Sequence, residues 1–210
     1  MIRILLADDH AMFRAGLRRI IDEEFEMLVT GEAADGREVM RKILAEDYDV
    51  VILDINLPGR NGIEVLSEIK TAKPNLAVLI LSMYSEEQFA LRAIRAGASG
   101  YLTKESAPVE LTSAIRKVAQ GSKYLSAAVA QLLAYEVDTC LEKLSHEKLS
   151  DREYEVMLQI TSGKKINEIA AELNLSSKTI STYRTRLLEK MGMETNAELT
   201  QYALRYGLLK

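Results

Sequence analysis

Short apolar runs alternate with amphipathic stretches over the first 120 residues of the chain. Runs such as IRILLA, VVIL and LAVLIL are rich in Val, Ile and Leu, and their length is typical of strands buried on both faces. Five strands alternating with five helices are predicted, which indicates an α/β domain with a parallel sheet covered on both faces. The strands are expected at residues 2–7, 27–34, 50–53, 76–81 and 101–102, and the helices near residues 12–21, 39–44, 63–69, 89–98 and 111–118.

The strand pattern stops at residue 122. Residues 127–135 have the pattern of a helix, and residues 136–148 are polar and aperiodic, which is typical of a linker. The rest of the chain predicts four helices and no strand, at residues 151–162, 166–173, 177–191 and 196–206. The predicted organisation is an α/β domain at 1–121, a helical linker at 122–148 and an all-α domain at 149–210.

Composition narrows the protein class. Of the 210 residues, 48% are hydrophobic and 28% are charged, as in globular proteins that fold in water. A single cysteine and two histidines exclude a disulfide scaffold and a His-rich metal centre. The first apolar run ends at Asp8, and the longest uncharged stretches span 12 residues, whereas a membrane helix needs about 20. We therefore expect a cytoplasmic protein with no membrane partner.

Charge is distributed unevenly along the chain. The net charge is −4, which by itself argues against nucleic-acid binding. Residues 176–190, however, carry four cations and one anion, a net charge of +3. A short basic stretch inside an acidic protein indicates a local anionic partner.

Polar side chains follow four of the five predicted strands. Asp8 and Asp9 come after the first strand, Asp54 after the third, Ser82 after the fourth and Lys104 after the fifth. Because ligands of open parallel sheets bind at the carboxyl ends of the strands, these side chains are expected to converge. Three crowded carboxylates favour a hard divalent cation such as Mg²⁺, and the lysine and the serine suit a phosphoryl oxygen.

The set of residues suggests that Asp54 is a carboxylate nucleophile that accepts a phosphoryl group. The alternative is that acidic residues end strands as turn formers, which we would favour for Asp8 or Asp9 alone. A phosphatase using Asp54 is a rival from the enzyme class, but such enzymes typically have a second acid two residues on, where this chain has Asn56.

Residues 1–120 resemble a response-regulator receiver domain, through LLADDH, VVILDINLPGRNGIEVL, LILS and GASGYLTK in that order. The resemblance implies a doubly wound, flavodoxin-like sheet with strand order 2-1-3-4-5. It also implies that a partner histidine kinase phosphorylates Asp54 and that the protein is not otherwise an enzyme. The further roles that it implies are Mg²⁺ binding by Asp9, Asp54 and the carbonyl of Asn56 with Asp8 acting through water, phosphoryl binding by Ser82 with Lys104, and an inward-turning switch aromatic at Tyr101.

One departure from the receiver pattern is visible. Receivers often have proline directly after the lysine, commonly with a cis bond, whereas Lys104 is followed by Glu105. The isomer of that bond stays open, since a cis bond is costly without proline.

The chain near its carboxyl end has the pattern of a helix-turn-helix. A short helix at 166–170 is followed by a turn at 174–176, and Ser176 is a good N-cap for a longer helix at 177–191. Small hydroxylated residues on the outer face of that helix are framed by cations, which suits base edges and phosphates in a major groove. They are Ser181, Thr182 and Thr185, with Lys178, Arg184 and Arg186 around them. The alternatives are a solvated charged face or a surface that binds protein.

Residues 149–209 resemble the LuxR-type DNA-binding domain of the NarL/FixJ regulators, along almost the whole run from LSDREYEVMLQI to TQYALRYGL. The resemblance implies base contacts by Ser181, Thr182 and Thr185, with Thr179 on the same surface, and phosphate contacts by Lys178, Arg184, Arg186 and Lys190. It places a dimer contact on the helix at 196–206. Tyr183 stands where many relatives have histidine, and its role stays open between the core edge and the DNA.

Together the two resemblances indicate a two-domain response regulator of the NarL/FixJ class. Phosphorylation of Asp54 is expected to control dimerisation and sequence-specific DNA binding. The expected partners are a cognate histidine kinase, promoter DNA and a second copy of the chain on DNA, with RNA polymerase as a further candidate. Mg²⁺ is the expected cofactor.

Overall fold

The computed structural model describes residues 1–138 and 145–209. The chain divides into two compact units, residues 1–134 and 135–210.

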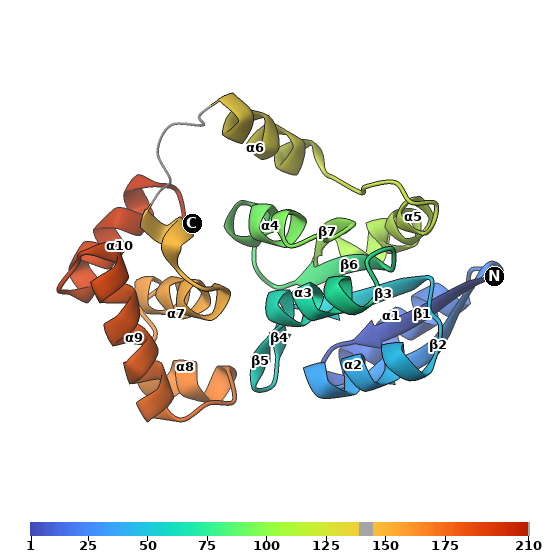
Figure 1. Ribbon diagram of the computed structural model, residues 1–210, viewed down its shortest axis with the longest axis horizontal. Helices are drawn as coiled ribbons and strands as arrows, with labels where there is room; N and C mark the ends of the chain where they lie inside the picture. Colours follow the sequence, from blue (N-terminus) through green and yellow to red (C-terminus); the bar gives the residue numbers. More distant parts are fainter. Residues whose placement is uncertain (139–144, 210) are drawn as a thin grey trace. The chain divides into compact units, whose positions relative to one another are not determined.

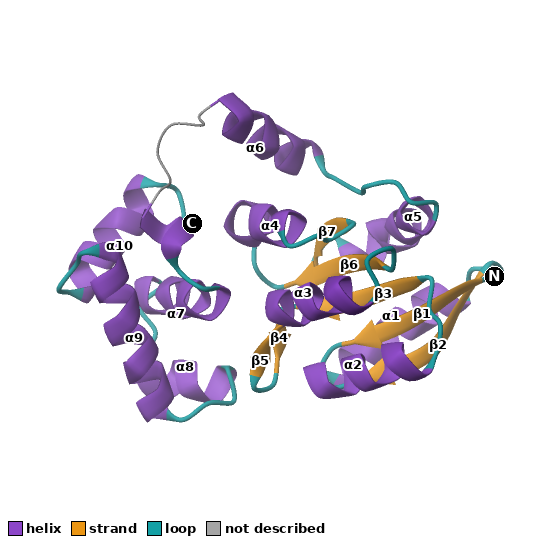
Figure 2. Ribbon diagram, in the orientation of Figure 1, coloured by secondary structure: helices purple, strands orange, loops and turns teal. Residues whose placement is uncertain are grey.

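Within the described part of the first unit, five parallel strands form one sheet in the order β2-β1-β3-β6-β7 (Figure 2). This confirms the predicted doubly wound sheet and its strand order. The strands are β1 (Ile2–Ala7), β2 (Met27–Ala33), β3 (Val50–Asp54), β6 (Ala77–Ser82) and β7 (Gly100–Thr103). Every residue of β3 and β6 is buried, because helices cover both faces of the sheet.

Helices lie on both sides of this sheet (Figure 1). Leu17 and Ile21 on one helix and Leu111 and Ile115 on another join a buried core with β1, β3 and β6. These two helices cover one face, and three others cover the opposite face. The first pair is α1 (Ala11–Asp22) and α5 (Ala107–Ala119), and the others are α2 (Gly36–Ala45), α3 (Gly62–Ala72) and α4 (Glu86–Arg95).

A small hairpin that the sequence did not predict follows β3. It consists of β4 (Asn56–Leu57) and β5 (Arg60–Asn61) and leads directly into α3. Asn61 caps α3 by accepting a hydrogen bond of 2.8 Å from the backbone N–H of Ile63. The next residue, Gly62, packs so closely that an added Cβ would lie 2.1 Å from the carbonyl oxygen of Asp54. The hairpin therefore fixes the backbone that carries Asp54.

Helix α6 (Ala127–Asp138) extends three residues beyond its predicted end. A 3₁₀ turn, η1 (Ser145–Lys148), precedes the second group of helices. Short helical backbone therefore forms at residues 136–138 and 145–148 of the predicted linker, despite its polar and aperiodic sequence. The rest of that segment, residues 139–144, lies outside the described residues. No described peptide bond is cis, so the bond between Lys104 and Glu105 is trans.

The described part of the second unit after η1 is helical throughout, as predicted. Tyr154, Ile169, Ile180 and Leu199 are almost fully buried and form its core. Ser150, Ser176 and Thr195 cap three of its helices by accepting from backbone N–H groups. The helices are α7 (Asp151–Thr161), α8 (Ile166–Glu172), α9 (Ser177–Met191) and α10 (Asn196–Arg205). Among the described residues, no helix combines the length and the apolar character that a bilayer span requires.

Candidate functional site

The carboxyl ends of β1, β3 and β7 bring one cation and two carboxylates together. The ammonium Nζ of Lys104 lies 2.6 Å from Oδ2 of Asp8 and 2.7 Å from Oδ2 of Asp54. The side chains of Lys104, Asp8 and Asp54 are only 7%, 4% and 2% exposed. Breaking such a buried ion pair by removing one partner is strongly destabilising, so the three side chains are held together.

Burial controls the protonation of this cluster. Burial, with a smaller contribution from the charge of Asp8, raises the pKa of Asp54 to about 6 against the opposing attraction of Lys104. Burial alone would lower the pKa of Lys104, but the two carboxylates outweigh it and raise that pKa. The lysine is therefore a permanent cation at neutral pH.

Further oxygen atoms surround Asp54. Single ligand atoms from Asp8, Asp9, His10 and Asp54 all lie within 4.8 Å of one another. The side-chain oxygen of Asn56 is buried without a hydrogen-bond partner among the described residues. Oδ1 of Asp9 contacts Nδ1 of His10, at 2.6 Å, and Oδ2 of Asp8 contacts Lys104. Buried oxygens with unused lone pairs are what a hard divalent cation would satisfy, so the residues fit Mg²⁺.

Asn56 also contacts Asp54 through its backbone, since its N–H donates a 3.1 Å hydrogen bond to Oδ1 of Asp54. The other oxygen, Oδ2, faces Lys104. The two oxygens of the carboxylate are thus held by different partners, which fixes its rotamer.

Ser82 lies beside this cluster at the end of β6 and is fully buried. Its hydroxyl accepts a 3.1 Å hydrogen bond from the N–H of Tyr84. Its carbonyl accepts a 2.7 Å bond from the N–H of Lys104, so the two candidate phosphoryl ligands share a backbone contact.

Tyr101 lies inside the unit, with 1% of its surface exposed. Its hydroxyl donates a 2.8 Å hydrogen bond to the carbonyl of Tyr84. The side chain is therefore held inside the unit through the backbone of Tyr84.

Two side chains of this region were not singled out from the sequence. His10 places Nδ1 2.6 Å from Oδ1 of Asp9, and Phe13 places its ring 4.7 Å from the ammonium of Lys104. The sequence could have indicated His10, because Asp8, Asp9 and His10 are three consecutive residues whose side chains can bind a metal ion. The position of Phe13 depends on how α1 packs, which the sequence pattern does not give.

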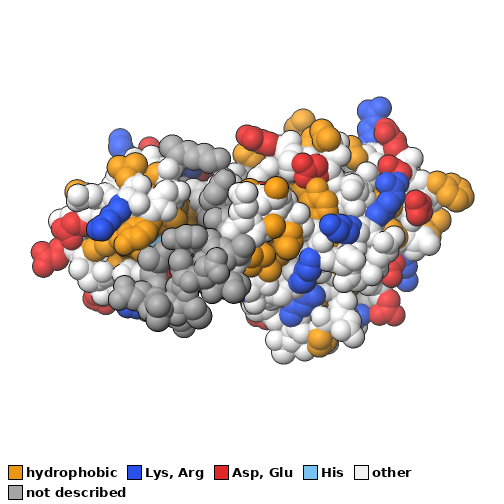
Figure 3. All heavy atoms as spheres, turned by 90° about the horizontal axis from the view of Figure 1, so that it is seen from above, with side chains coloured by type: hydrophobic (Ala, Val, Ile, Leu, Met, Phe, Trp, Pro, Cys, Tyr) orange, Lys and Arg blue, Asp and Glu red, His pale blue; other side chains and the backbone are white. Residues whose placement is uncertain are grey.

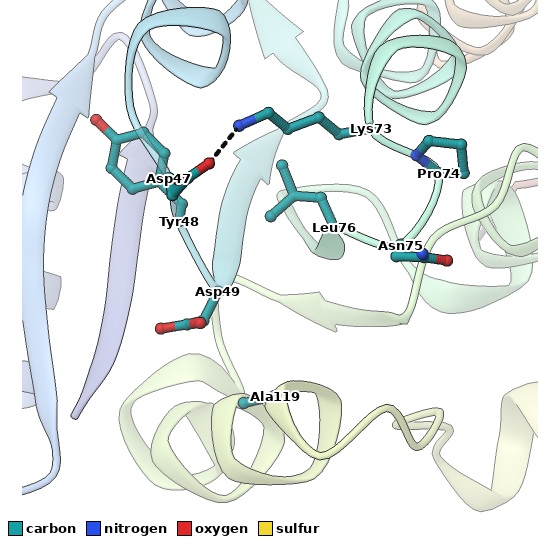
Figure 4. A pocket seen from close by; sticks show the side chains of 8 residues that line it. All are labelled: Asp47, Tyr48, Asp49, Lys73, Pro74, Asn75, Leu76 and Ala119. Carbon is teal, nitrogen blue, oxygen red and sulfur yellow. Dashed lines mark hydrogen bonds and ion pairs between the residues drawn. The ribbon is translucent and has the colours of Figure 1, made fainter.

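A hollow of about 470 Å³ lies at the opposite end of the sheet, next to the amino ends of β3 and β6. Figure 4 shows its lining, in which the carboxylate of Asp47 pairs with the ammonium of Lys73 at 2.9 Å. None of the predicted site residues lines it.

The second predicted site lies on α9. Ile180, Leu187 and Met191 face the core. Charges of both signs are mixed over the face drawn in Figure 3, whereas the outer face of α9 carries cations around hydroxyl groups. Exposed on it are Lys178, Ser181, Thr182, Thr185, Arg186 and Lys190, with Thr179, Tyr183 and Arg184 half-buried.

The hydroxyls of α9 bond to their own helix. Oγ of Ser181 and Oγ1 of Thr182 and Thr185 each donate to the carbonyl four residues earlier, at 2.9–3.1 Å. Their donors are occupied, so the hydroxyl oxygens keep acceptor lone pairs for an outside partner.

Two of the expected phosphate ligands have partners within the unit. Nε of Arg184 donates to Oδ1 of Asn196 at 2.7 Å, and Nζ of Lys190 donates to Oε2 of Glu153 at 2.6 Å. Lys178 and Arg186 help to line a shallow hollow beside Tyr183. In α10, Leu204 and the adjacent Tyr206 are 64% and 40% exposed.

Comparison with known protein families also divides the chain into two domains. The model of the response regulator receiver domain matches residues 4–116. The model of the bacterial regulatory proteins of the luxR family matches residues 147–203.

Similar curated proteins extend along the whole chain. The response regulator UvrY of Escherichia coli strain K12 is 38% identical over 209 residues, which are 99% of this chain and 96% of that protein. The response regulator GacA of Pseudomonas aeruginosa is 33% identical over 213 residues, covering 100% of this chain and 98% of its own.

Solved structures of response regulators are also similar to this chain. RcsB from Salmonella enterica serovar Typhimurium, bound to the promoter rprA with the phosphomimetic BeF₃⁻, matches with a TM-score of 0.64 and 26% identity over 96% of this chain and 97% of that one. A LuxR-family response regulator from Aurantimonas sp. SI85-9A1 matches with a TM-score of 0.61 and 40% identity over 65% of this chain and 98% of its own. The chain therefore belongs to the response regulators that join a receiver domain to a LuxR-type DNA-binding domain, a family of transcription regulators rather than enzymes.

Proposed function

We propose that Asp54 accepts a phosphoryl group from a partner histidine kinase, and that the acyl phosphate controls binding of duplex DNA by α9. The observation that carries the first half is the buried ion pair of Lys104 with Asp8 and Asp54. An ion pair with a purely structural role is usually exposed. This one is buried at the edge of the sheet where ligands of parallel sheets bind.

In the transfer, a carboxylate oxygen of Asp54 forms a bond to phosphorus. The bond between phosphorus and the histidine nitrogen of the kinase breaks, and its electron pair returns to that nitrogen. Lys104 remains protonated and balances charge on the transferred group. The hydroxyl of Ser82, already buried beside Lys104, supplies a hydrogen-bond donor for a phosphoryl oxygen.

Asp8, Asp9, Asp54 and the carbonyl of Asn56 would hold Mg²⁺, which supplies further positive charge to the transferred group when it is bound. The proximity of the ligand atoms of Asp8, Asp9 and Asp54, and the buried side-chain oxygen of Asn56, support the assignment.

The second half of the proposal rests on α9. Its exposed hydroxylated residues Ser181, Thr182 and Thr185, with Thr179 at the edge, are proposed to meet base edges. Lys178 and Arg186 are proposed to bind phosphates as they stand, and Arg184 and Lys190 after exchanging their internal partners for a phosphate. The related RcsB has been solved bound to promoter DNA.

We further propose that the exposed apolar side of α10 joins two copies on DNA, and that the protein acts in the cytoplasm, where duplex DNA and RNA polymerase are available. Leu204 near the end of α10 and Tyr206 just after it support this, because they leave apolar surface exposed.

Intact-mass spectrometry with acetyl phosphate and Mg²⁺ tests the acceptor. We expect one added phosphoryl group on the wild type and none on Asp54→Asn. The matched control is Asp47→Asn, because Asp47 is exposed at the other end of the sheet, and it should gain the group as the wild type does. A phosphoryl group on Asp54→Asn, or its absence from the wild type, would contradict the proposal.

A further inference from the structure

The segment between α5 and α6, residues 122–126, runs back along the outer edge of the sheet (Figure 1). The N–H of Tyr124 donates a 2.8 Å hydrogen bond to the carbonyl of Ser99, and Tyr124 bridges Gly100 of the edge strand β7. A Cβ added to Gly100 would lie 2.8 Å from the carbonyl oxygen of Tyr124. Glycine at position 100 is therefore what lets the segment reach the strand.

A side-chain bond fastens the same segment to α5. The hydroxyl of Tyr124 donates to Oε2 of Glu110 at 2.7 Å. Burial, together with this carboxylate, raises the pKa of Tyr124 to about 12, so the hydroxyl stays a donor at all physiological pH values. The segment therefore enters α6 from a fixed position on the receiver unit.

Ser126 joins two helices through one hydroxyl. Its Oγ donates a 2.5 Å hydrogen bond to Oε2 of Glu86, the first residue of α4. The same Oγ accepts a 3.2 Å bond from the N–H of Val129, as an N-cap of α6. Val129 itself is fully buried. A short bond to a carboxylate is stronger than a neutral one, so Glu86 helps to fix the position of the hydroxyl that caps α6.

Glu86 lies four residues beyond Ser82, and the intervening backbone holds the contacts of the phosphoryl site. The N–H of Tyr84 donates to the hydroxyl of Ser82, and its carbonyl accepts from Tyr101. Residues 82–86 thus contact the buried site at one end and Ser126 at the other. Any displacement of Ser82 has to be taken up by this five-residue stretch.

We propose that the bond between Ser126 and Glu86 is a latch that couples occupancy of Asp54 to helix α6. This rests on the proposed function, because it requires a phosphoryl group on Asp54. When the hydroxyl of Ser82 turns to donate to that group, residues 82–86 are drawn toward Asp54. Glu86 is withdrawn from Ser126, and the amino end of α6 loses its fixed cap. Helix α6 leads in sequence toward the DNA-binding domain.

Hydrogen exchange of the full-length protein tests the latch, with beryllofluoride and Mg²⁺ as the probe. In the wild type, amides of residues 127–131 should exchange about fivefold faster with beryllofluoride, the factor expected for loss of one N-cap. In Ser126→Ala they should exchange at the faster rate both with and without it. Ser122→Ala is the matched control, because Ser122 is exposed and only its backbone N–H is bonded, and it should respond like the wild type.

A second variant separates coupling from a merely structural role. Glu86→Gln keeps an acceptor oxygen for Ser126 and should retain a smaller response, whereas Glu86→Ala should match Ser126→Ala. If Ser126 and Glu86 had only a structural role, their alanine variants would speed exchange of residues 127–131 equally with and without beryllofluoride. The change caused by beryllofluoride would then be as large as in the wild type.

The outcomes also separate the latch from the function on which it rests. If residues 82–104 gain protection with beryllofluoride while residues 127–131 are unchanged, the latch is wrong and the phosphoryl site stands. If neither region responds, the proposed function and the latch are both wrong.

Discussion

The ammonium of Lys190 lies 2.6 Å from a carboxylate oxygen of Glu153, which ties the last turns of α9 to the first turn of α7. The carboxylate is 4% exposed and the lysine side chain 44%. The residue that the sequence suggested as a phosphate ligand therefore also holds the DNA-binding domain together.

The ion pair of Lys190 and Glu153 makes the stability of the DNA-binding domain depend on pH. Burial alone would raise the pKa of Glu153, but bonds from Lys190 and Ser150 outweigh it and hold the pKa below its usual value. A depressed folded-state pKa adds stability above the unfolded pKa of about 4.3, and that stability is lost as pH falls through the folded value. Urea unfolding followed at residues of α9 should show a loss below about pH 4.3. Glu153→Gln should flatten this part of the profile, and an unchanged profile would contradict the account.

Removing the buried cation should destabilise the receiver unit. Lys104→Ala leaves Asp8 and Asp54 facing each other, which we expect to cost about 3 kcal/mol in the free energy of unfolding. Because a divalent cation would replace the missing charge, Mg²⁺ should recover part of that loss. Urea titrations with and without Mg²⁺ measure both effects. If Lys104→Ala were as stable as the wild type, the ion pair would not stabilise the cluster of Asp8 and Asp54.

Two glycines give opposite predictions for the same substitution. Gly62→Ala puts a Cβ 2.1 Å from the carbonyl of Asp54 and should cost about 3 kcal/mol. Gly16→Ala, in α1, meets nothing within 4 Å and should stabilise the protein by about 0.5–1 kcal/mol. Thermal unfolding of the two variants checks this, and equal effects would contradict the close packing behind Asp54.

Cations and hydroxyls of α9 should affect DNA binding differently. Arg186→Ala should weaken binding to all duplexes alike and lower the salt slope by about 1, as expected for one phosphate contact. Thr185→Ala should change the preference among sequences and leave the salt slope as it is. The control is Arg41→Ala on α2, whose side chain is 72% exposed. Fluorescence anisotropy at several salt concentrations is the measurement, and equal salt slopes for Arg186→Ala and the control would contradict the assignment.

Sequence reasoning was most successful where a repeating pattern carries the information. The apolar runs of β1, β3 and β6 need burial on both faces, and that requirement predicts a covered parallel sheet. The convergence of Asp8, Asp54 and Lys104 followed from strand order alone, because carboxyl ends of parallel strands share an edge.

Contacts that depend on packing could not be predicted. Strands of two residues, such as β4 and β5, are too short to show a period. The bond between Ser126 and Glu86 joins residues 40 positions apart through a loop whose path depends on Gly100. The partners of Arg184 and Lys190 likewise depend on how α9 packs against its neighbours.

DNA affinity with and without phosphoryl donor tests the central claim most directly. The titration would use promoter fragments recovered by genomic footprinting, full-length wild type, Asp54→Asn and the control Asp47→Asn, each with acetyl phosphate and Mg²⁺. We predict that the donor raises affinity at least about tenfold, or about 1.4 kcal/mol, for the wild type and the control, and leaves Asp54→Asn unchanged. An equal rise for Asp54→Asn, or no rise for a wild type shown to be phosphorylated, would contradict control of DNA binding through Asp54.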